Sequence, residues 1–503
     1  MSDWGGGYVT DVEYPRHYYL AQSPHLMAVA CVMNGVAVDM PWQVPRLHYL
    51  ELGCGRGVNA CVLAAANPGW QVTGIDFTPA AIADARRFAR DAGLGNVTFI
   101  EADLADFAET AEAASLAPAD VASMHGVWSW VADRVRAGIV RLLAAKVRAG
   151  GMVHVSYNAM PAHQGMLGMQ RLLRETGRRL GGRSDQQIAA ALEVVRQLAD
   201  AEARQLGSTP LAREMLGLLP DMPVAYLAHE YMNTDWRPCF HGDVAGALAA
   251  AKLDYAGSAR LQENFVDLML TPAQRMVYDR SDDPLMRELV MDTCINRTLR
   301  HDIYVRGTAR LSPEARDAIL GEVPLVLATL PESFVYTLDA PAGEAAMNRD
   351  YYAPMVEALA AGPRRVAELL ALPTGREHHR NPGEVVMTLA GNYRALVAPW
   401  PDEVADARLR RFNAVVARRD VHLGALTRPS VLASLCLGAG YPCRAVEAFL
   451  VDRIGAAGGA IDPAVMATEL APSLPAEEHA RLVALLTDVL GERLAVWQRL
   501  GLV

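Results

Sequence analysis

The sequence lacks the features that mark extracellular and membrane-spanning proteins. Its seven cysteines form neither a C-x-x-C pair nor a Cys/His zinc spacing, so we expect reduced thiols in a cytosolic protein. No basic segment followed by an apolar run opens the chain. The most apolar stretch, 431–450, is interrupted by glycine, proline and charged residues. We therefore expect a cytoplasmic protein without a membrane span.

Aromatic residues and positive charge are scarce as well. Aromatic side chains make up only 7% of the chain, and the formal net charge is -10. Neither stacking platforms nor a broad basic surface for nucleic acid is therefore expected. The chain does have 503 residues, of which 51% are hydrophobic and 21% charged. That composition is typical of a globular protein with about two to four domains.

Short apolar runs alternate with helical patterns over much of the N-terminal half. Such runs, separated by helix-like stretches, predict buried parallel strands. Two further strand-like runs after residue 250 complete a set of seven. The pattern predicts a doubly wound, mostly parallel α/β sheet with helices on both faces. The predicted strands are 47–52, 71–76, 97–102, 120–125, 152–157, 255–261 and 302–306.

Interruptions of this rhythm predict the domain organisation. Residues 162–235 read as a helical insertion, and 311–503 mix amphipathic helices with loops rich in proline and glycine. The C-terminal region is therefore expected to be α-rich or α+β, with a winged-helix-like form as one option. We predict an N-terminal lid over 1–45, a cofactor-binding domain over 46–161 plus 236–310, and a regulatory, substrate-binding or dimerisation region over 311–503.

A glycine-rich loop joins the first predicted strand to the first helix. Its glycines, Gly53, Gly55 and Gly57, run G-x-G-x-G, whereas a dinucleotide fingerprint needs its third glycine at position 58, which is Val58. Glu51, two positions ahead of the first glycine, is more typical of a methyltransferase than of a dehydrogenase. The loop therefore predicts contact with the adenosine and methionine parts of S-adenosylmethionine.

Acidic residues follow the second and third strands. Asp76 lies where a carboxylate reaches the ribose hydroxyls of a nucleotide, and Asp103 is expected to accept from the adenine amino group. Phe77 and Leu104 are expected to sandwich the adenine ring. The predicted cofactor site comprises Tyr14, Glu51, Gly53, Cys54, Gly55, Gly57, Asn59, Asp76, Phe77, Asp103, Leu104, His125 and Gly126.

These motifs resemble those of class I S-adenosylmethionine-dependent methyltransferases. Residues 125–131, 155–161, 226–231 and the approach 14–26 are similar to bacterial members with a methyltransferase regulatory domain. Among these members are rickettsial lysine methyltransferases that act on outer-membrane proteins. The resemblance, which covers about 10–310, implies an S-adenosylmethionine cofactor, S-adenosylhomocysteine as product and a protein lysine as acceptor. The family usually has Tyr at Trp128, Gly-Trp at 162–163 and His at Ser23.

Methyl transfer from a sulfonium needs positioning and, for a lysine acceptor, loss of a proton. The residues predicted to be catalytic are His125, Trp128 and Tyr157, which follow or end the fourth and fifth strands. Core packing is an equally good interpretation of Trp128. Tyr14, Tyr18 and Tyr19 are expected in the lid. His229 and Glu230 match half of a zinc motif, but position 233 is asparagine, so no metal is predicted.

Three functions remain open on the sequence. The first is methylation of a protein side chain, the second is methylation of a small metabolite or natural product, and the third is a cofactor-binding sensor with vestigial catalysis. The helical insertion and the long C-terminal region favour a large or regulated substrate. Additions of this kind also form dimer interfaces, so a homodimer remains open.

Overall fold

A seven-stranded sheet lies at the centre of the computed structural model, which describes residues 5–14, 16–373, 381–421, 426–459 and 461–503. The strand order is β4-β3-β2-β5-β6-β8-β7. In this sheet β8 alone runs opposite to the other strands. The predicted doubly wound sheet is confirmed. Its strands are β2 (His48–Leu52), β3 (Gln71–Asp76), β4 (Val97–Glu101), β5 (Ala119–Met124), β6 (Val147–Asn158), β7 (Leu253–Ser258) and β8 (Leu299–Arg306).

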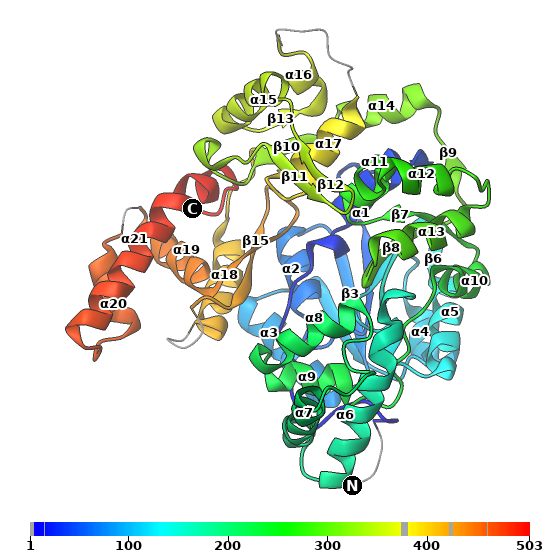
Figure 1. Ribbon diagram of the computed structural model, residues 1–503. Coiled ribbons are helices and arrows are strands. Elements are labelled where there is room, and N and C mark those ends of the chain that lie inside the picture. Colours follow the sequence, from blue (N-terminus) through cyan, green and yellow to red (C-terminus); the bar gives the residue numbers. More distant parts are fainter. Residues whose placement is uncertain (1–4, 15, 374–380, 422–425, 460) are drawn as a thin grey trace.

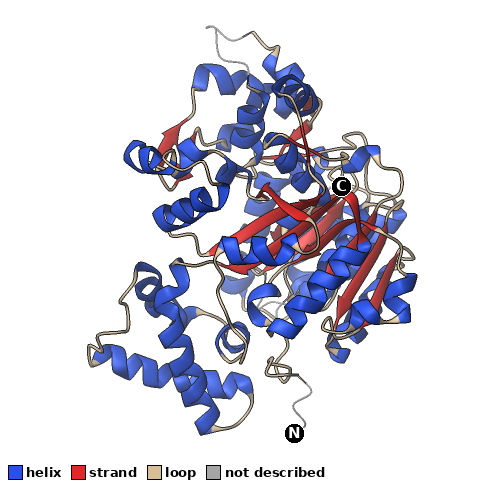
Figure 2. Cartoon of the chain, turned by 90° about the vertical axis from the view of Figure 1, so that its right-hand side faces the viewer, coloured by secondary structure: helices blue, strands red, loops and turns tan. Residues whose placement is uncertain are grey.

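Helices cover both faces of this sheet (Figure 2). Successive strand residues point to opposite faces, so Tyr49 enters one hydrophobic core and Leu50 the other. This burial on both sides explains why the strands read as continuous apolar runs. The first face packs against α1 (Pro24–Met33), α2 (Val58–Ala66) and α3 (Pro79–Ala92), and the second against α4 (Ala111–Ser115), α5 (Asp133–Lys146) and α10 (His241–Ala249).

Four inserted helices form a group of their own beside the sheet (Figure 1). Apolar residues at helical spacing, such as Met169 with Leu173 and Ile188 with Val195, close a separate core within this group. Val9 and Val12 of the N-terminal segment enter the same core. The insertion and the N-terminal segment therefore pack as one unit. Its helices are α6 (Met166–Leu180), α7 (Ser184–Asp200), α8 (Pro210–Leu218) and α9 (Val224–Tyr231).

The C-terminal region is α+β. A three-stranded antiparallel sheet of order β13-β10-β14 lies among helices, and two hairpins, β11-β12 and β15-β16, accompany it. Its strands are β10 (Pro324–Leu327), β11 (Thr337–Ala340), β12 (Gly343–Ala346), β13 (Arg364–Arg365), β14 (Ala395–Val397), β15 (Pro429–Ser434) and β16 (Ala439–Arg444). Its helices are α14 (Pro313–Gly321), α15 (Arg349–Ala361), α16 (Val366–Leu370), α17 (Pro382–Ala390), α18 (Ala407–Asp420), α19 (Ala445–Ala457), α20 (Pro463–Leu470) and α21 (Ala476–Arg499).

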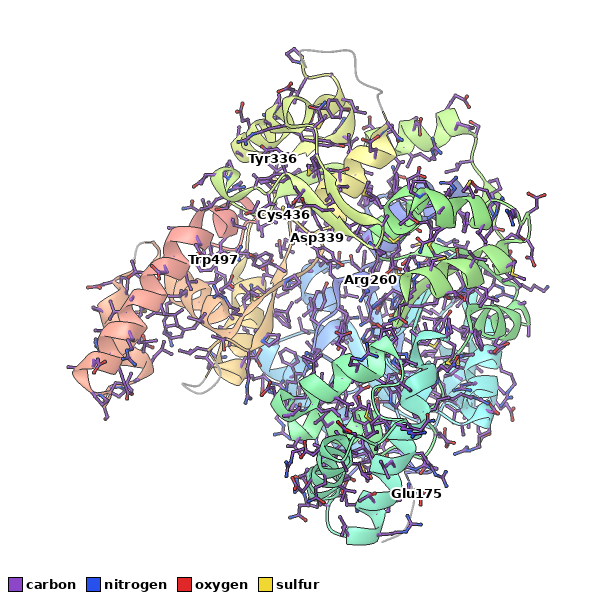
Figure 3. The ribbon with its side chains drawn as sticks, in the orientation of Figure 1. Glu175, Arg260, Tyr336, Asp339, Cys436 and Trp497 are labelled. Atoms are coloured by element: carbon purple, nitrogen blue, oxygen red, sulfur yellow. The ribbon has the colours of Figure 1, made fainter. Side chains whose placement is uncertain are left out.

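This region packs closely on the central domain. One hydrophobic core continues from α1 and α2 into residues 320–435. Arg408 on α18 donates to the carbonyl oxygens of Ala64 and Ala65 on α2 at 3.2 and 2.5 Å. A second core around Trp497 and Cys436 joins the last helices (Figure 3). Because no separate core begins at 310, the domain boundary placed there remains a prediction.

The remaining elements connect the strands. They are β1 (Val36–Ala37) and β9 (Ala309–Arg310), which pair with each other, and α11 (Val266–Met269), α12 (Pro272–Tyr278) and α13 (Pro284–Ile295), which lie between β7 and β8. Within the described ranges, no helix is both long and apolar enough to cross a membrane.

Candidate active site

A cavity of about 660 Å³ opens at the carboxyl ends of β2, β3, β4 and β5. The loops that follow parallel strands meet at this edge, where ligands bind in open α/β sheets. The opposite wall comes from the N-terminal segment and from α9. All the predicted cofactor residues line the cavity except Gly57. Those that do are Tyr14, Glu51, Gly53, Cys54, Gly55, Asn59, Asp76, Phe77, Asp103, Leu104, His125 and Gly126.

The glycine loop presents its backbone to the cavity. Gly55 has φ +51°, which disfavours larger residues, and a Cβ built on it would meet nothing within 4 Å. The Gly55 N–H donates to Asp76 Oδ2 at 2.8 Å, which ties the loop to the end of β3. Gly57 has another role, because a Cβ there would lie 2.6 Å from Phe99 Cζ. This glycine therefore allows α2 to pack closely and does not line the cavity.

Asp76 and Asp103 differ in their surroundings. Asp76 accepts the N–H groups of Gly55 and Thr78, both at 2.8 Å, and its burial raises its pKa. Each oxygen keeps acceptor capacity toward the cavity. Asp103 is 46% exposed and forms a 3.1 Å ion pair with Arg134. A ligand donor at Asp103 therefore shares this carboxylate with a guanidinium.

Glu51 is a buried carboxylate without a cationic partner. Its side chain lines the cavity, and its buried Oε2 has no hydrogen-bond partner among the described residues. Burial raises the pKa of Glu51 to about 8. An uncompensated buried carboxylate costs free energy unless a cation reaches it. The position therefore fits a positively charged ligand group, as the ammonium of a methionine moiety would be.

The N-terminal segment closes the cavity as a chain of aromatic contacts. Tyr8 meets the edge of Phe77 at a centroid distance of 5.7 Å, and Tyr14 meets His229 at 5.0 Å. Tyr19 stacks on His125 at 3.6 Å. Tyr18 departs from the expected lid, because its hydroxyl accepts the N–H of Gly440 in β16 at 2.9 Å. The lid thus extends from the end of β3 to the end of β5.

Helix α9 and the residues just after it hold this segment through His229, which belongs to the half of a zinc motif noted in the sequence, and through Asn233, where that motif would need histidine. His229 Nε2 donates to the carbonyl oxygen of Val12 at 2.8 Å. Asn233 Oδ1 accepts the N–H of Val9 at 2.8 Å. Both side chains therefore fix the backbone of the N-terminal segment in place.

His125 begins a stack of imidazoles that leads away from the cavity. Its Nδ1 lies 2.9 Å from Ser156 Oγ, which accepts the Gly126 N–H. His154 Nε2 and His301 Nδ1 lie 3.2 Å apart, and one ring nitrogen from each of these two residues and from His125 lies within 4.8 Å of the others. Burial, with the neighbouring His154, holds the pKa of His125 well below its usual value. His125 is therefore neutral at pH 7.

Trp128 and Tyr157 lie outside the cavity lining. Trp128 is 2% exposed, and the Arg136 guanidinium lies 5.9 Å from its ring centre. Tyr157 is fully buried in the same hydrophobic core as Trp128, and its hydroxyl donates to Asp302 at 2.7 Å. Their placement favours structural roles. Sequence reasoning, in turn, missed Tyr8 and Glu230, which line the cavity; the only signal for Glu230 was its motif.

Comparisons with known proteins fit this geometry. A model described as "Methyltransferase domain" matches residues 50–153, and one described as "Predicted methyltransferase regulatory domain" matches 223–306. An uncharacterised protein of Synechocystis is 32% identical over 366 residues, which cover 73% of this chain and 71% of that protein. A trans-aconitate 2-methyltransferase of Acidovorax is 31% identical over 167 residues, or 33% of this chain and 54% of the relative.

The fold is shared over almost the whole chain with one solved structure. PKMT2 from Rickettsia typhi, in complex with AdoHcy, superposes with a TM-score of 0.72 at 16% identity, covering 97% of this chain and all of that one. The protein is therefore an S-adenosylmethionine-dependent methyltransferase. More narrowly, it belongs to the methyltransferases that carry a predicted methyltransferase regulatory domain.

Proposed function

We propose that this methyltransferase modifies a protein side chain, namely the amine of lysine. The observation that carries the proposal is the charge of the cavity wall, which has an excess of carboxylates and no lysine. Such a wall attracts a cation and repels an anion. The carboxylates belong to Asp11, Glu13, Glu51, Asp76, Asp84, Asp103, Glu230 and Asp235, and the cations are Arg16, Arg56, Arg87 and Arg134.

In this proposal the cofactor occupies the end of the cavity nearest the glycine loop. Glu51 holds the methionine ammonium, Asp76 the ribose hydroxyls and Asp103 the adenine amino group, while Phe77 and Leu104 flank the ring. The cofactor supplies an activated methyl group on sulfur. The chain's own residues orient the acceptor and exclude water, and orientation contributes up to roughly 7–11 kcal/mol in well-aligned systems.

The acceptor is constrained further in two ways. The resemblance of residues 125–131 to lysine-modifying relatives supports a protein acceptor. The acidic wall argues against an acceptor such as trans-aconitate, which is itself an anion. A metabolite acceptor and a sensor without turnover are the alternatives that the experiment separates.

The test is incubation of the purified chain with methyl-labelled S-adenosylmethionine and a bacterial lysate. We expect label in the protein fraction and, after acid hydrolysis, in methylated lysine. Label confined to small molecules would favour the metabolite alternative. No transfer, with cofactor binding intact by calorimetry, would favour the sensor.

The dependence of the rate on pH gives a second check on a lysine acceptor. A lysine ammonium has no lone pair, and its unperturbed pKa is about 10.4. At subsaturating acceptor, the rate should rise with pH and approach tenfold per unit below the controlling pKa. A rate that stays constant from about pH 6 to 9, with chemistry limiting, would contradict a lysine acceptor.

A further inference from the structure

One end of the cavity combines aromatic walls with a carboxylate. Glu230, on α9, lines the cavity next to His229, whose ring meets Tyr14. Tyr8 and Tyr19 of the N-terminal segment line the same space. The lid contacts both sides of this space, because Tyr8 meets Phe77 after β3 and Tyr19 stacks on His125 after β5.

Glu230 differs from several other acids of the cavity in its ion pairing. Asp84 binds Arg16 at 3.5 Å and Arg56 at 2.6 Å, and Asp103 binds Arg134. No arginine or lysine among the described residues forms an ion pair with Glu230, whose polar partner is the Tyr226 hydroxyl. Burial raises the pKa of Glu230 to about 7. The carboxylate of Glu230 can therefore take up and release a proton near neutral pH, as a general base must.

The aromatic walls suit the same ligand as the carboxylate. Tyrosine faces attract an ammonium within about 6 Å of the ring centre. They also exclude water, which lowers the pKa of an amine held between them. An anionic acceptor would be repelled by the ionised carboxylate.

We propose that Glu230, together with Tyr14 and Tyr19, forms the binding site for the acceptor amine and that Glu230 removes its proton. The inference rests on the proposed function, because it assumes an ammonium-bearing acceptor. Glu230 would be the base, whereas the sequence predicted catalytic residues at His125, Trp128 and Tyr157 and assigned no base among them. Neutral His125, stacked under Tyr19, would serve as a wall of the channel.

The step balances without any other reactant. The ammonium nitrogen gives one proton to the Glu230 carboxylate and thereby gains a lone pair. That lone pair bonds the methyl carbon while the carbon–sulfur bond breaks, and its electrons stay on sulfur. The positive charge of the sulfonium is thus transferred to the methylated nitrogen, and Glu230 returns its proton to solvent after product release.

Glu230→Gln tests this role, because it removes the charge and keeps the shape. Affinity for S-adenosylhomocysteine should stay within about twofold by calorimetry, which also verifies folding. Methyl transfer to the labelled lysate proteins at pH 7 should fall by roughly 10²-fold or more, the usual contribution of a general base. Glu230→Asp should recover part of the loss. The matched control is Glu214→Gln on the exposed side of α8, which should leave the rate unchanged.

A pH profile distinguishes proton removal from a structural role. The groups facing Glu230 are Tyr8, Tyr14 and Tyr19 from the lid and Tyr226 and Tyr231 from its own helix, and burial raises the pKa of each. The sheet edge adds Glu51, Asp76 and His125 to the same cavity. In the glutamine variant, the deficit relative to wild type should shrink toward pH 9, as the free amine becomes more abundant.

The outcomes separate the two proposals. If the wild-type chain labels no protein, the proposed function fails whatever Glu230 does. If it labels lysine and Glu230→Gln is as fast with the same pH profile, the acceptor site is placed wrongly while the proposed function stands. A large loss of S-adenosylhomocysteine affinity would place Glu230 in the cofactor site and would also overturn the inference.

Discussion

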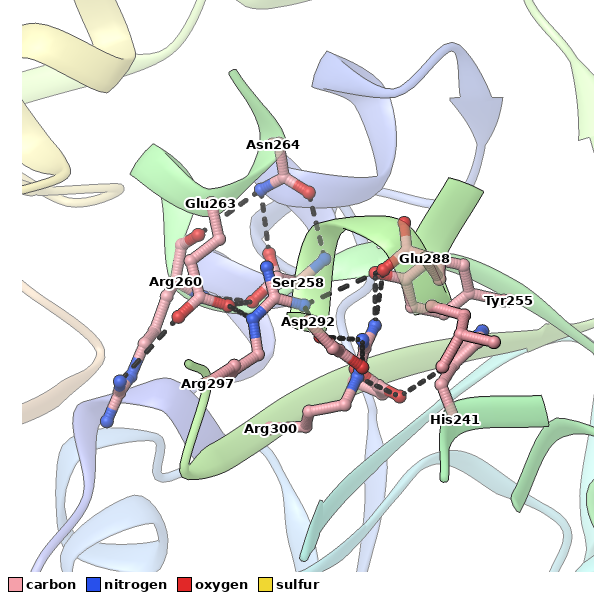
Figure 4. A network of polar contacts seen from close by, with 12 residues as sticks. His241, Tyr255, Ser258, Arg260, Glu263, Asn264, Glu288, Asp292, Arg297 and Arg300 are labelled. Carbon is pink, nitrogen blue, oxygen red and sulfur yellow. Dashed lines mark hydrogen bonds and ion pairs between the residues drawn. The ribbon is translucent and has the colours of Figure 1, made fainter. Parts of the chain in front are cut away.

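Two regions of this protein contain buried carboxylates, and one pairs each of them with a guanidinium, whereas the cavity leaves Glu51 and Glu230 without an ion pair among the described residues. Around Arg300 every acid has a guanidinium: Arg300 contacts Asp292 at 2.7 Å, Asp302 at 2.8 Å and Glu288 at 2.7 Å (Figure 4). Although burial raises the pKa of Asp302, Arg300 and His241 hold it below its usual value. In the cavity, Glu51 lacks such a partner and its pKa rises.

The difference separates acids that stabilise the fold from acids that serve a ligand. A buried carboxylate with its guanidinium is electrostatically complete, and breaking the pair leaves an uncompensated charge. A buried carboxylate without a cation is an unfavourable feature that persists where a ligand completes it. The network thus belongs to the connection between α13 and β8, and the unpaired cavity acids fit the cationic cofactor and the ammonium-bearing acceptor proposed above.

The largest expected effect is on the network. Arg300→Met should lower the free energy of unfolding by roughly 3–5 kcal/mol, because the buried carboxylates of Asp292 and Asp302 would lose the guanidinium that they share, although Asp292 keeps Arg297 and Asp302 keeps His241. Urea denaturation measures this change. Arg275→Met is the control, since its partners Asp267 and Asp279 are exposed, and it should cost about 1 kcal/mol or less. Equal losses for the two variants would erase the distinction between the regions.

The next effect is in the cavity and concerns binding rather than folding. Asp76→Ala should lose hydrogen bonds to the cofactor worth roughly 1.5–3 kcal/mol, which weakens affinity about 10- to 150-fold. The measurement is calorimetric titration with S-adenosylhomocysteine. Part of the loss would come from the Gly55 N–H, which loses its acceptor. Unchanged affinity in a folded variant would remove Asp76 from the site.

The smallest effect concerns an exposed pair at the cavity edge. Arg134 and Asp103 are 60% and 46% exposed, so their ion pair is screened by solvent. Arg134→Ala should change the free energy of unfolding by about 1 kcal/mol or less and should leave Asp103 able to bind the cofactor. Denaturation and calorimetry on one sample test both points. A loss of affinity like that of Asp76→Ala would show that Arg134 itself holds the cofactor.

Much of the fold could be predicted from the sequence because its signals are local. Most strands of the sheet contain a short apolar run, and the turn after β2 needs residues such as Gly55 that tolerate positive φ. Pattern alone could not tell that Gly57 faces Phe99, or that Trp128 packs in the core, because burial depends on the partner across the fold.

The sequence predicted a lid but could not show which contacts hold it in place. Contacts between residues near 10 and residues near 230 arise only in the folded chain, where His229 and Asn233 hold the backbone of Val12 and Val9. The motif around Glu230 could therefore be recognised as a resemblance, and its place on the cavity wall could not be derived. The hydrogen bond from Tyr157 to Asp302 could not be predicted either, because β8 follows the whole insertion in the sequence and meets β6 only in the folded chain.

The most direct test of the claim that the cavity acids serve a cationic ligand is the pH dependence of S-adenosylmethionine binding. In the protein without ligand the pKa of Glu51 is about 8, so below that pH its carboxyl group carries a proton. A cation that binds there must displace this proton, which weakens binding as the pH falls. Affinity should therefore rise between pH 5.5 and 7, approaching tenfold per unit, and Glu51→Gln should flatten the rise. The same raised pKa means that Glu51 stabilises the free protein below about pH 4.5 and that this contribution is lost as pH rises to about 8. Calorimetric titrations of both proteins at each pH would contradict the claim if their affinities followed the same curve.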